Sequence, residues 1–257
     1  ALPFRAVLAQ RNALDYLMLD ATWAAAEGQR LLADAVREAA HSQVDGKTRR
    51  LGILGQALGH SRSPRLHQQP FDRIDLGVDA PLDELLDALQ PHYRGLAVTN
   101  PFKKRIAAVA QAPLPAVNTL IRAGDGWHAE NSDVAGAEAI LAALGPATRV
   151  TVLGDGGVTA ALRIAAANLS VELGVLTRGA ITAEPLRGPI VWTWPALVGV
   201  PEALRFEDAQ VAVIAYGTPA RSIVNEIVAR GGTPRRLGPR WFIAQARRQR
   251  LLWESAT

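Results

Sequence analysis

The 257-residue chain contains no cysteine and few aromatic residues, which make up 5% of the sequence. The lack of cysteine excludes disulfides, thiolate catalysis and cysteine-ligated zinc or iron–sulfur centres. The five histidines form no HExxH or comparable short ligand spacing. We therefore expect no metal site in this protein.

Long apolar runs and an excess of charge of one sign are also lacking. The longest apolar stretches are broken by charge or proline well short of the roughly 20 residues of a membrane span, and the first residues lack a signal-peptide pattern. The formal net charge of +4 reflects a mild arginine excess, and both signs are spread along the chain. These features predict a cytoplasmic protein that binds neither membranes nor nucleic acid.

The remaining composition is typical of a folded α/β protein. Hydrophobic residues make up 49% of the chain, enough for one large core or two smaller ones. Short apolar runs alternate with helical periodicity, which indicates largely parallel strands connected by helices. A helix is predicted over residues 133–144, where apolar positions share a face and Gly145-Pro146 ends it. The expected strands are residues 51–54, 73–78, 96–99, 117–122, 150–153, 171–177, 190–193 and 211–216.

The segment 149–157 is typical of a dinucleotide-binding turn. An apolar strand is followed by Gly154, Gly156 and Gly157 and then by an alanine-rich helical stretch. Such glycines let the backbone approach a pyrophosphate, whose negative charge the helix N-terminus stabilises. A tight turn without a ligand would use the same glycines, so both interpretations stay open.

Arg178 follows the next predicted strand and bears on the choice of cofactor. An acidic residue there would hold a free ribose hydroxyl, whereas arginine can pair with the 2′-phosphate of NADP. The residue therefore favours NADP over NAD. Asp155 adds a carboxylate beside the proposed pyrophosphate site, and the next basic residue is Arg187. The alternative interpretation of Arg178 is a surface arginine without a ligand.

Polar segments also follow the strands of the N-terminal half. Ser61 and Ser63 point the same way in an extended segment, and Ser63 is the expected cap of a helix opened by Pro64, which suits a bound carboxylate. Asn100 is likewise the expected cap of a helix with Lys103 in its first turn, where a cation opposes the helix dipole. Plain helix caps and a solvated lysine are the alternatives.

Taken together, the motifs resemble the shikimate dehydrogenase family from about Leu51 to the C-terminus. Asp133 opens the predicted helix 133–144, where an acid complements the helix dipole, and it belongs to one of the motifs. The motifs that carry the resemblance, in the family's order, are residues 60–64, 98–103, 116–119, 131–133 with Gly136, 154–157, and 242–246 with Trp253.

The resemblance implies two α/β domains with a cleft between them. A substrate-binding domain would comprise residues 51–132, completed by a C-terminal helix over residues 240–257, and a Rossmann-like NADP-binding domain would comprise residues 133–239. The implied reaction is the NADPH-dependent reduction of 3-dehydroshikimate to shikimate, on the path to chorismate and aromatic amino acids. The implied enzyme is a monomer or a homodimer whose partner is this small-molecule substrate.

The resemblance also assigns roles to individual residues. Lys103 would donate a proton to the reacting oxygen, and Asp133 would orient and electrostatically support it. Ser61 and Ser63 would bind the substrate carboxylate. The residues that would hydrogen-bond the ring hydroxyls are Thr99, Asn118 and Gln245. The residues that would bind NADP are Gly154, Gly156, Gly157, Thr177, Arg178 and Tyr216.

Several positions depart from the family pattern. Ala97 stands where the family usually has asparagine before its Val-Thr pair, and Trp192-Thr193-Trp194 stands where it has Asn-Ala-Thr. The segment between Arg178 and Ile190 is too short for the helix expected there, and Arg240 replaces a usual glycine. Ala97 leaves quinate or another cyclic hydroxy acid open as the substrate, and the altered cofactor half leaves open a low-turnover ligand-binding homologue.

The first fifty residues lie outside the family core. They contain an amphipathic helical stretch over residues 21–41 and a polar linker over residues 43–50, and are expected to be a helical extension of unknown role. Residues 13–20 faintly resemble a strand of type I dehydroquinase. Fifty residues cannot form that enzyme's barrel, which needs on the order of 200 residues, so a remnant and an unrelated extension are the two interpretations.

Overall fold

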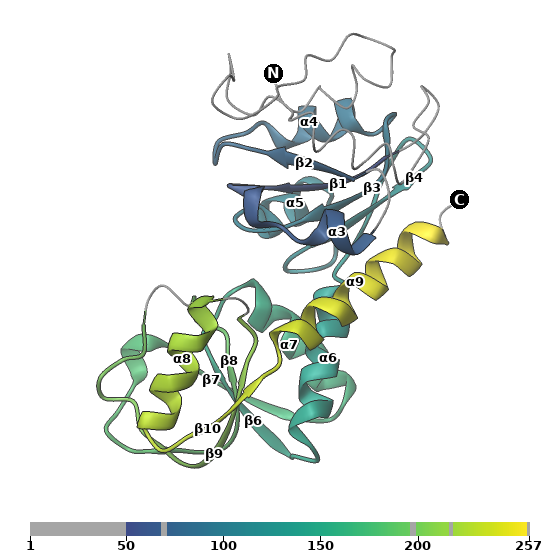
Figure 1. Cartoon of the computed structure of the whole chain (residues 1–257). Coiled ribbons are helices and arrows are strands. Elements are labelled where there is room, and N and C mark those ends of the chain that lie inside the picture. Colours follow the sequence, from purple (N-terminus) through teal and green to yellow (C-terminus); the bar gives the residue numbers. More distant parts are fainter. Residues whose placement is uncertain (1–49, 68–70, 196–198, 216–217, 256–257) are drawn as a thin grey trace, which may run out of the picture. The chain divides into compact units, whose positions relative to one another are not determined.

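The structure is a computed structural model that describes residues 50–67, 71–195, 199–215 and 218–255. The described chain divides into two compact units, one ending at Glu130 and resuming at Gln249, the other spanning Asn131–Arg248. Each unit has its own sheet flanked by helices (Figure 1). The predicted α/β class with two domains is confirmed. The predicted N-terminal helix over residues 21–41 lies outside the described residues.

The first unit is built on a mixed sheet with the described strands in the order β2-β1-β3-β4-β5. The first three strands pair in parallel, and the last two form an antiparallel hairpin beside β3. The strands are β1 (Arg50–Gly55), β2 (Phe71–Asp75), β3 (Tyr93–Val98), β4 (Thr119–Ala123) and β5 (Gly126–Glu130). The helical segments are η2 (Leu58–His60), α3 (Ser63–His67), α4 (Leu82–Leu89) and α5 (Lys103–Val109).

Alternation of side chains along the strands separates two apolar layers in this unit. Leu96 and Val98 of β3 contribute to the core that also contains the buried leucines of α4. Ala97 between them belongs to the opposite cluster, together with Leu51 of β1 and Trp253. Because successive strand residues point to opposite faces, each apolar residue of β3 is committed to one layer.

A buried ion pair connects the three parallel strands. The Arg50 guanidinium, 3% exposed, donates two hydrogen bonds of 2.6 Å to the two carboxylate oxygens of Asp72. The Tyr93 hydroxyl donates to the same carboxylate at 2.8 Å. The arrangement is bidentate and has an additional donor, which are the conditions under which a buried ion pair offsets its desolvation cost.

The last turns of α9 (Gly238–Glu254) are part of the first unit. The Trp253 indole is 1% exposed and donates its Nε1–H to the Leu120 carbonyl at 3.0 Å. A Cβ on Gly95 would lie 2.2 Å from the indole ring, so β3 needs glycine where the ring crosses it. His67 lies against the same ring at 5.0 Å between centroids and stacks on Phe71 at 5.1 Å.

The second unit contains a parallel sheet with the described strands in the order β10-β9-β8-β6-β7. The chain runs from β6 outward to β7 and then returns to the other side of β6 for β8, so the direction of winding reverses between β6 and β8. The strands are β6 (Arg149–Leu153), β7 (Glu172–Leu176), β8 (Leu186–Trp192), β9 (Phe206–Val213) and β10 (Thr233–Arg236). The helices that precede α9 are α6 (Asp133–Leu144), α7 (Gly157–Asn168), η3 (Arg178–Ala180) and α8 (Thr218–Ala229).

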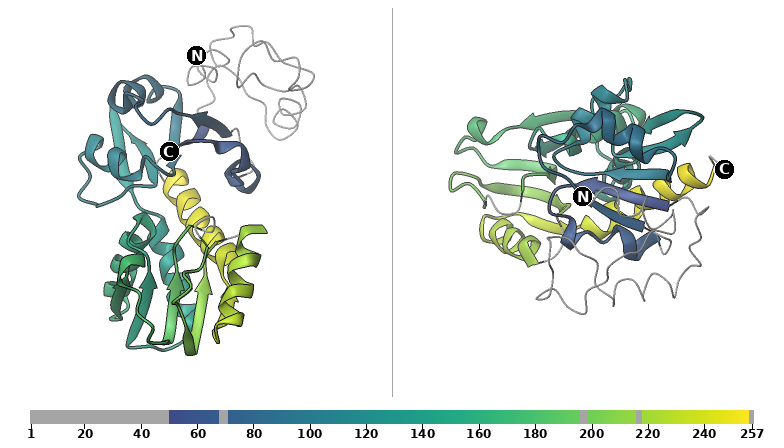
Figure 2. Two further views of the ribbon diagram at one scale, coloured as in Figure 1. Left: turned by 90° about the vertical axis from the view of Figure 1, so that its left-hand side faces the viewer. Right: turned by 90° about the horizontal axis from the view of Figure 1, so that it is seen from above.

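Helices cover both faces of this sheet. Helices α6 and α7 pack on one face, where Val152 and Val191 are buried with the apolar residues of both helices. Helix α8 packs on the opposite face with Ile190 and Trp192 (Figures 1 and 2). This two-sided covering is the doubly wound arrangement expected of a Rossmann-like domain.

The predictions of helices and strands are confirmed where the signal lies in neighbouring residues of the sequence. The predicted helix over residues 133–144 is α6, and Gly145, with φ of 87°, ends it. The described residues between Arg178 and Ile190 contain no α-helix, as predicted, and instead form the short 3-10 helix η3 and the start of β8. The prediction missed β5 and the polar edge strand β10 because neither has a continuous apolar run.

None of the helices in the described ranges is long and apolar enough to cross a membrane. The same residues contain no group of three or more histidine, aspartate or glutamate side chains arranged to hold a metal ion.

The His67 ring yields a prediction about stability and pH. Burial and, to a smaller extent, the charge of Arg250 lower the pKa of His67 from 6.5 to about 4, and a hydrogen bond with Gln249 opposes the shift. The unfolded chain therefore binds a proton between pH 6.5 and 4 that the folded chain does not, and stability is lost as pH falls through this window. Between pH 7 and pH 4.5, we expect His67→Phe to lose about 2–3 kcal/mol less than the wild type.

Urea unfolding of both proteins at pH 7 and at pH 4.5 measures this difference. The other titrating groups are common to both proteins and cancel in the comparison. Identical losses of unfolding free energy in the two proteins would contradict the prediction.

Candidate functional site

The carboxyl ends of β1 and β3 bring two of the predicted polar segments together. The Thr99 N–H, directly after β3, donates to the carbonyl of Leu54 in β1 at 2.9 Å. A Cβ on Gly55 would lie 2.4 Å from Thr99 Cγ2 and 2.6 Å from Leu58 Cδ2. Gly55 thus permits the close approach of both loops, and Thr99 lies beside the segment that leads to Ser61.

Lys103 lies in the first turn of α5, as predicted, but the expected capping of this helix is wrong. Asn100 and Pro101 precede the helix and are joined by a cis peptide bond. The Phe102 N–H donates to the Thr99 carbonyl at 3.0 Å and closes a turn before the helix begins at Lys103. Asn100 is therefore a turn residue and not the helix cap.

Asn118 is buried, with 1% of its surface exposed, at the same end of the sheet. Its carbonyl accepts from Val98 N–H at 2.8 Å and from Gln249 Nε2 at 3.1 Å, and its side-chain Oδ1 accepts from the Thr119 hydroxyl at 2.9 Å. The Val117 N–H donates to the Lys103 carbonyl at 3.0 Å. Backbone hydrogen bonds thus hold the segments of Thr99, Lys103 and Asn118 next to one another.

Ser61 and Ser63 follow β1, as predicted, but Ser63 does not have the expected capping role. Ser63 is the first residue of α3 and is buried, and its N–H donates to the Ser61 hydroxyl oxygen at 3.4 Å. The expectation that Ser63 caps this helix is wrong, because the accepting oxygen belongs to Ser61. The Ser61 carbonyl accepts from Arg73 at 3.1 Å, which anchors the loop to β2.

Asp133 and Gln245 belong to the second unit and lie on neighbouring helices. Asp133 is the first residue of α6 and is 3% exposed, and its N–H donates to Asn131 Oδ1 at 3.1 Å. One turn later, a Cβ on Gly136 would lie 2.9 Å from the Trp241 ring of α9. Gly136 therefore permits the close packing of α6 on α9, the helix that carries the half-buried Gln245.

Gly154 follows β6 at the point where the winding of the sheet reverses. Its φ is +126°, and a Cβ would lie 2.5 Å from Thr193 Oγ1 and 3.0 Å from Trp194 Cδ1, directly after β8. The Thr159 hydroxyl donates to the Gly154 carbonyl at 2.8 Å and the Thr193 hydroxyl donates to the Leu153 carbonyl at 2.8 Å. Ligands of doubly wound sheets bind at this type of switch point, outside the carboxyl ends of the strands.

The residues after Gly154 fit a nucleotide pyrophosphate. A Cβ on Gly156 would meet nothing within 4 Å, so this side of the turn has open space. Gly157 begins the 12-residue helix α7, whose first N–H groups favour an anion. The Asp155 carboxylate, which counts against an anion, is exposed and pairs with Arg163 at 3.6 Å.

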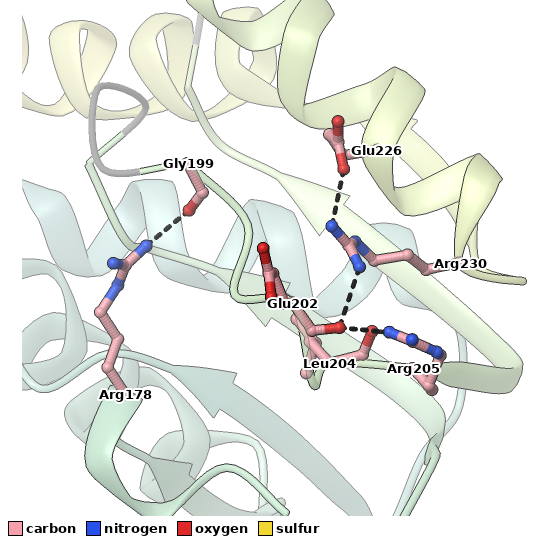
Figure 3. A network of polar contacts seen from close by, with 7 residues as sticks. All are labelled: Arg178, Gly199, Glu202, Leu204, Arg205, Glu226 and Arg230. Carbon is pink, nitrogen blue, oxygen red and sulfur yellow. Dashed lines mark hydrogen bonds and ion pairs between the residues drawn. The ribbon is translucent and has the colours of Figure 1, made fainter. Parts of the chain in front are cut away.

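Thr177 and Arg178 are exposed and follow β7, the strand beside β6. The Arg178 guanidinium donates to the Gly199 carbonyl, and its Cζ lies 5.2 Å from the centroid of the Trp194 ring. Figure 3 shows the arginine side chain extended toward Gly199. Tyr216 lies outside the described residues.

Two residues of these sites, Gln249 and Trp194, were missed by the sequence analysis. Gln249 lies one helical turn after Gln245, and this spacing was the only available signal for it. In the sequence, Trp194 differs from the rest only as a departure from a family motif. Nothing in its local sequence indicates a contact with Arg178, which comes from the neighbouring positions of β6, β7 and β8 in the sheet.

The similarity to known proteins agrees with these features. No family model matches the chain. It is 32% identical over 197 residues to the shikimate dehydrogenase (NADP(+)) of Anaeromyxobacter dehalogenans (strain 2CP-C), covering 68% of this chain and 70% of that protein. The chain belongs to the shikimate dehydrogenase family. A second relative, shikimate dehydrogenase (NADP(+)) of Anaeromyxobacter sp. (strain K), is 35% identical over 154 residues, and the match spans about half of each chain, 52% of this one and 55% of that one.

Solved structures share the fold of this family member. A shikimate 5-dehydrogenase of Thermus thermophilus, in complex with NADP(H) and shikimate, is 22% identical with a TM-score of 0.66, covering 81% of this chain and 94% of that one. A quinate dehydrogenase of Corynebacterium glutamicum, in complex with NAD, is 23% identical with a TM-score of 0.63 over the same shares. The fold is therefore common to both activities and does not distinguish them.

The geometry at Gly154 predicts a large effect of a small substitution. Gly154→Ala places a Cβ 2.5 Å from Thr193 Oγ1 at a φ that disfavours any side chain. We expect it to lower the free energy of unfolding by about 2–4 kcal/mol, measured by urea denaturation.

Gly156→Ala is the matched control, because its Cβ would lie in open space and its φ is −101°. It should change stability by no more than about 0.5 kcal/mol. Equal stabilities of the two variants would show that the contact with Thr193 does not constrain the turn.

Proposed function

We propose that the chain is an NADP-dependent shikimate dehydrogenase, which reduces 3-dehydroshikimate to shikimate. The observation that carries the proposal is the grouping of Ser61, Thr99, Lys103 and Asn118 at one end of the first sheet in a member of this family. They come from three segments, with Thr99 and Lys103 on the same one, and backbone hydrogen bonds of Thr99 with Leu54 and of Val98 with Asn118 hold the segments together. Two hydroxyls, an ammonium group and an amide suit a small molecule with a carboxylate and several hydroxyl groups.

In this proposal the predicted site residues supply substrate recognition and a proton. Ser61 and Ser63 bind the carboxylate, and Thr99, Asn118 and Gln245 hydrogen-bond the ring hydroxyls. Lys103 donates a proton from Nζ to the carbonyl oxygen of the substrate while a hydride reaches the carbonyl carbon, and the product is the alcohol. Asp133 is the second catalytic residue that the resemblance implies.

The second unit holds the cofactor in this proposal. NADPH, when bound, supplies the hydride. Gly154, Gly156 and Gly157 let the backbone approach the pyrophosphate at the N-terminus of α7. Thr177 and Arg178 would contact the 2′-phosphate of the adenosine, and Tyr216, which lies outside the described residues, is the remaining predicted cofactor-binding residue. A guanidinium can pair with the 2′-phosphate through charge-assisted hydrogen bonds, which supports NADP over NAD.

Quinate and the other cyclic hydroxy acids are less well supported as substrates. The reason to consider these substrates is Ala97, which replaces a polar residue of the family pattern. In the structure Ala97 is buried in the apolar cluster with Leu51 and Trp253, so the substitution has a structural reason. Steady-state rates with shikimate and with quinate decide between the two substrates. The location in the cytoplasm and the monomeric or dimeric state stay predictions.

Lys103→Ala tests the proton donor. We expect kcat to fall by about a hundredfold or more with little change in substrate affinity, because proton transfer is lost while the binding groups remain. The rate of NADPH oxidation with 3-dehydroshikimate measures this effect. Lys104→Ala, the exposed neighbour, is the control and should retain the wild-type rate. A Lys103→Ala enzyme with unchanged kcat would refute the assignment.

Arg178→Gln tests the choice of cofactor. Loss of charge-assisted hydrogen bonds to the 2′-phosphate should lower kcat/KM for NADPH by about 10- to 100-fold and leave kcat/KM for NADH nearly unchanged. Arg187→Gln is the control, because this arginine pairs with Glu207 on the sheet. Equal losses with both cofactors would exclude a selective role for Arg178.

A further inference from the structure

Trp194 occupies a fixed position between the glycine turn and Arg178. Its indole is 6% exposed and meets the Trp192 ring edge-on at 5.1 Å between centroids. A Cβ on Gly154 would lie 3.0 Å from Trp194 Cδ1, so the ring also lies close to the turn. The ring therefore has little freedom, and it presents a rigid aromatic surface to the arginine.

Arg178 contacts this surface as a cation on an aromatic ring. The distance of 5.2 Å from its Cζ to the ring centroid is within the range in which such a contact is attractive. The guanidinium also donates to the carbonyl of Gly199, in the loop after β8. Two contacts from one segment thus fix the side chain, although it is exposed.

Arginines also hold the segment 199–205, which begins at Gly199 (Figure 3). Arg205 donates to the Leu204 carbonyl at 2.9 Å, and Arg230 donates to the Glu202 carbonyl at 3.1 Å. Arg230 is oriented in turn by an ion pair with Glu226 at 2.9 Å. The Gly199 carbonyl, the acceptor for Arg178, therefore lies three residues before a position that Arg230 holds.

The fixed position of Arg178 is important for binding a phosphate because the residues that follow it in the sequence contribute little other positive charge. The next basic residue, Arg187, pairs with Glu207 on the adjacent strand. Recognition of a 2′-phosphate thus depends largely on Arg178. An arginine side chain loses considerable rotamer entropy when it binds, and fixing it beforehand lowers that cost.

We propose that Trp194 is a positioning residue that gives the site its selectivity for 2′-phosphorylated nucleotides. It acts through Arg178, which it holds in the orientation that receives the 2′-phosphate. This inference rests on the proposed function as an NADP-dependent enzyme and adds the residue that determines its cofactor specificity.

Calorimetric titration of the full chain with 2′,5′-ADP and with 5′-AMP tests the inference. Trp194→Leu should weaken 2′,5′-ADP by about three- to tenfold, the value of a partly exposed cation–π contact, and leave 5′-AMP unchanged. Trp194→Phe retains an aromatic ring and should restore part of the selectivity. Thermal unfolding of each variant identifies those that are folded, and Trp194→Phe keeps the test available if the leucine variant does not fold.

The decisive comparison places Trp194→Phe in the Arg178→Gln background. If the tryptophan acts through the arginine, its replacement changes 2′,5′-ADP affinity in the wild type but not in this background. An undiminished effect there, or equal weakening of 2′,5′-ADP and 5′-AMP, overturns the inference and indicates direct stacking on adenine or a purely structural role.

The outcomes that contradict the proposed function differ from those that contradict the role of Trp194. Wild-type protein that neither prefers 2′,5′-ADP over 5′-AMP nor oxidises NADPH overturns both proposals. Wild-type protein that oxidises NADPH in preference to NADH, with the same preference in Trp194→Phe and Trp194→Leu, overturns only the role of Trp194.

Discussion

Parallel pairing of neighbouring strands is the constraint on which both sites depend. When two strands run in parallel, the segments that follow them leave the sheet at the same edge. In the first unit this places the loop after β1 and the turn after β3 together, at the close contact of Gly55 with Thr99. In the second unit it places Gly154, Arg178 and Trp194 together after β6, β7 and β8. The topology of the sheet therefore makes neighbours of residues that are far apart in the sequence and whose local sequence contains no signal for the contact.

The hydrogen bonds around Asn118 convert this arrangement into a fixed one. Its main chain joins the end of β3 to the hairpin of β4 and β5, and Gln249 of α9 donates to both the Asn118 carbonyl and the Thr119 hydroxyl. These groups are buried, so each lost partner would leave a costly unsatisfied polar atom. The C-terminal turns of α9 thus help to hold a predicted substrate-binding residue, and Trp253 anchors them through Leu120.

The difference between what could and could not be predicted from sequence follows the range of the interactions. Helix α6 was predictable because its apolar face and its glycine stop are local signals. The expected cap at Asn100 failed because the turn from Thr99 to Phe102 competes with the helix for the same residues. Ser61, not Ser63, accepts the hydrogen bond at α3 for a similar reason, since either serine satisfies the local pattern. Gln249 and Trp194 acquire their roles only through tertiary packing, which a pattern of residues along the sequence does not indicate.

The departures at residues 192–194 have to be understood as one packing solution. Trp192 fills the apolar layer under α8, which a polar residue could not occupy without a partner. Thr193 contacts the space that any side chain at Gly154 would need, and bonds to the Leu153 carbonyl. Trp194 then lies on Arg178, while the Trp192 indole N–H donates to the Trp194 carbonyl at 3.2 Å. Because the two tryptophan rings pack on each other and Thr193 and Trp194 both lie against the glycine turn, replacing any one alone by its family counterpart would leave a cavity or an unpaired group there, and the segment is expected to tolerate change best as a set.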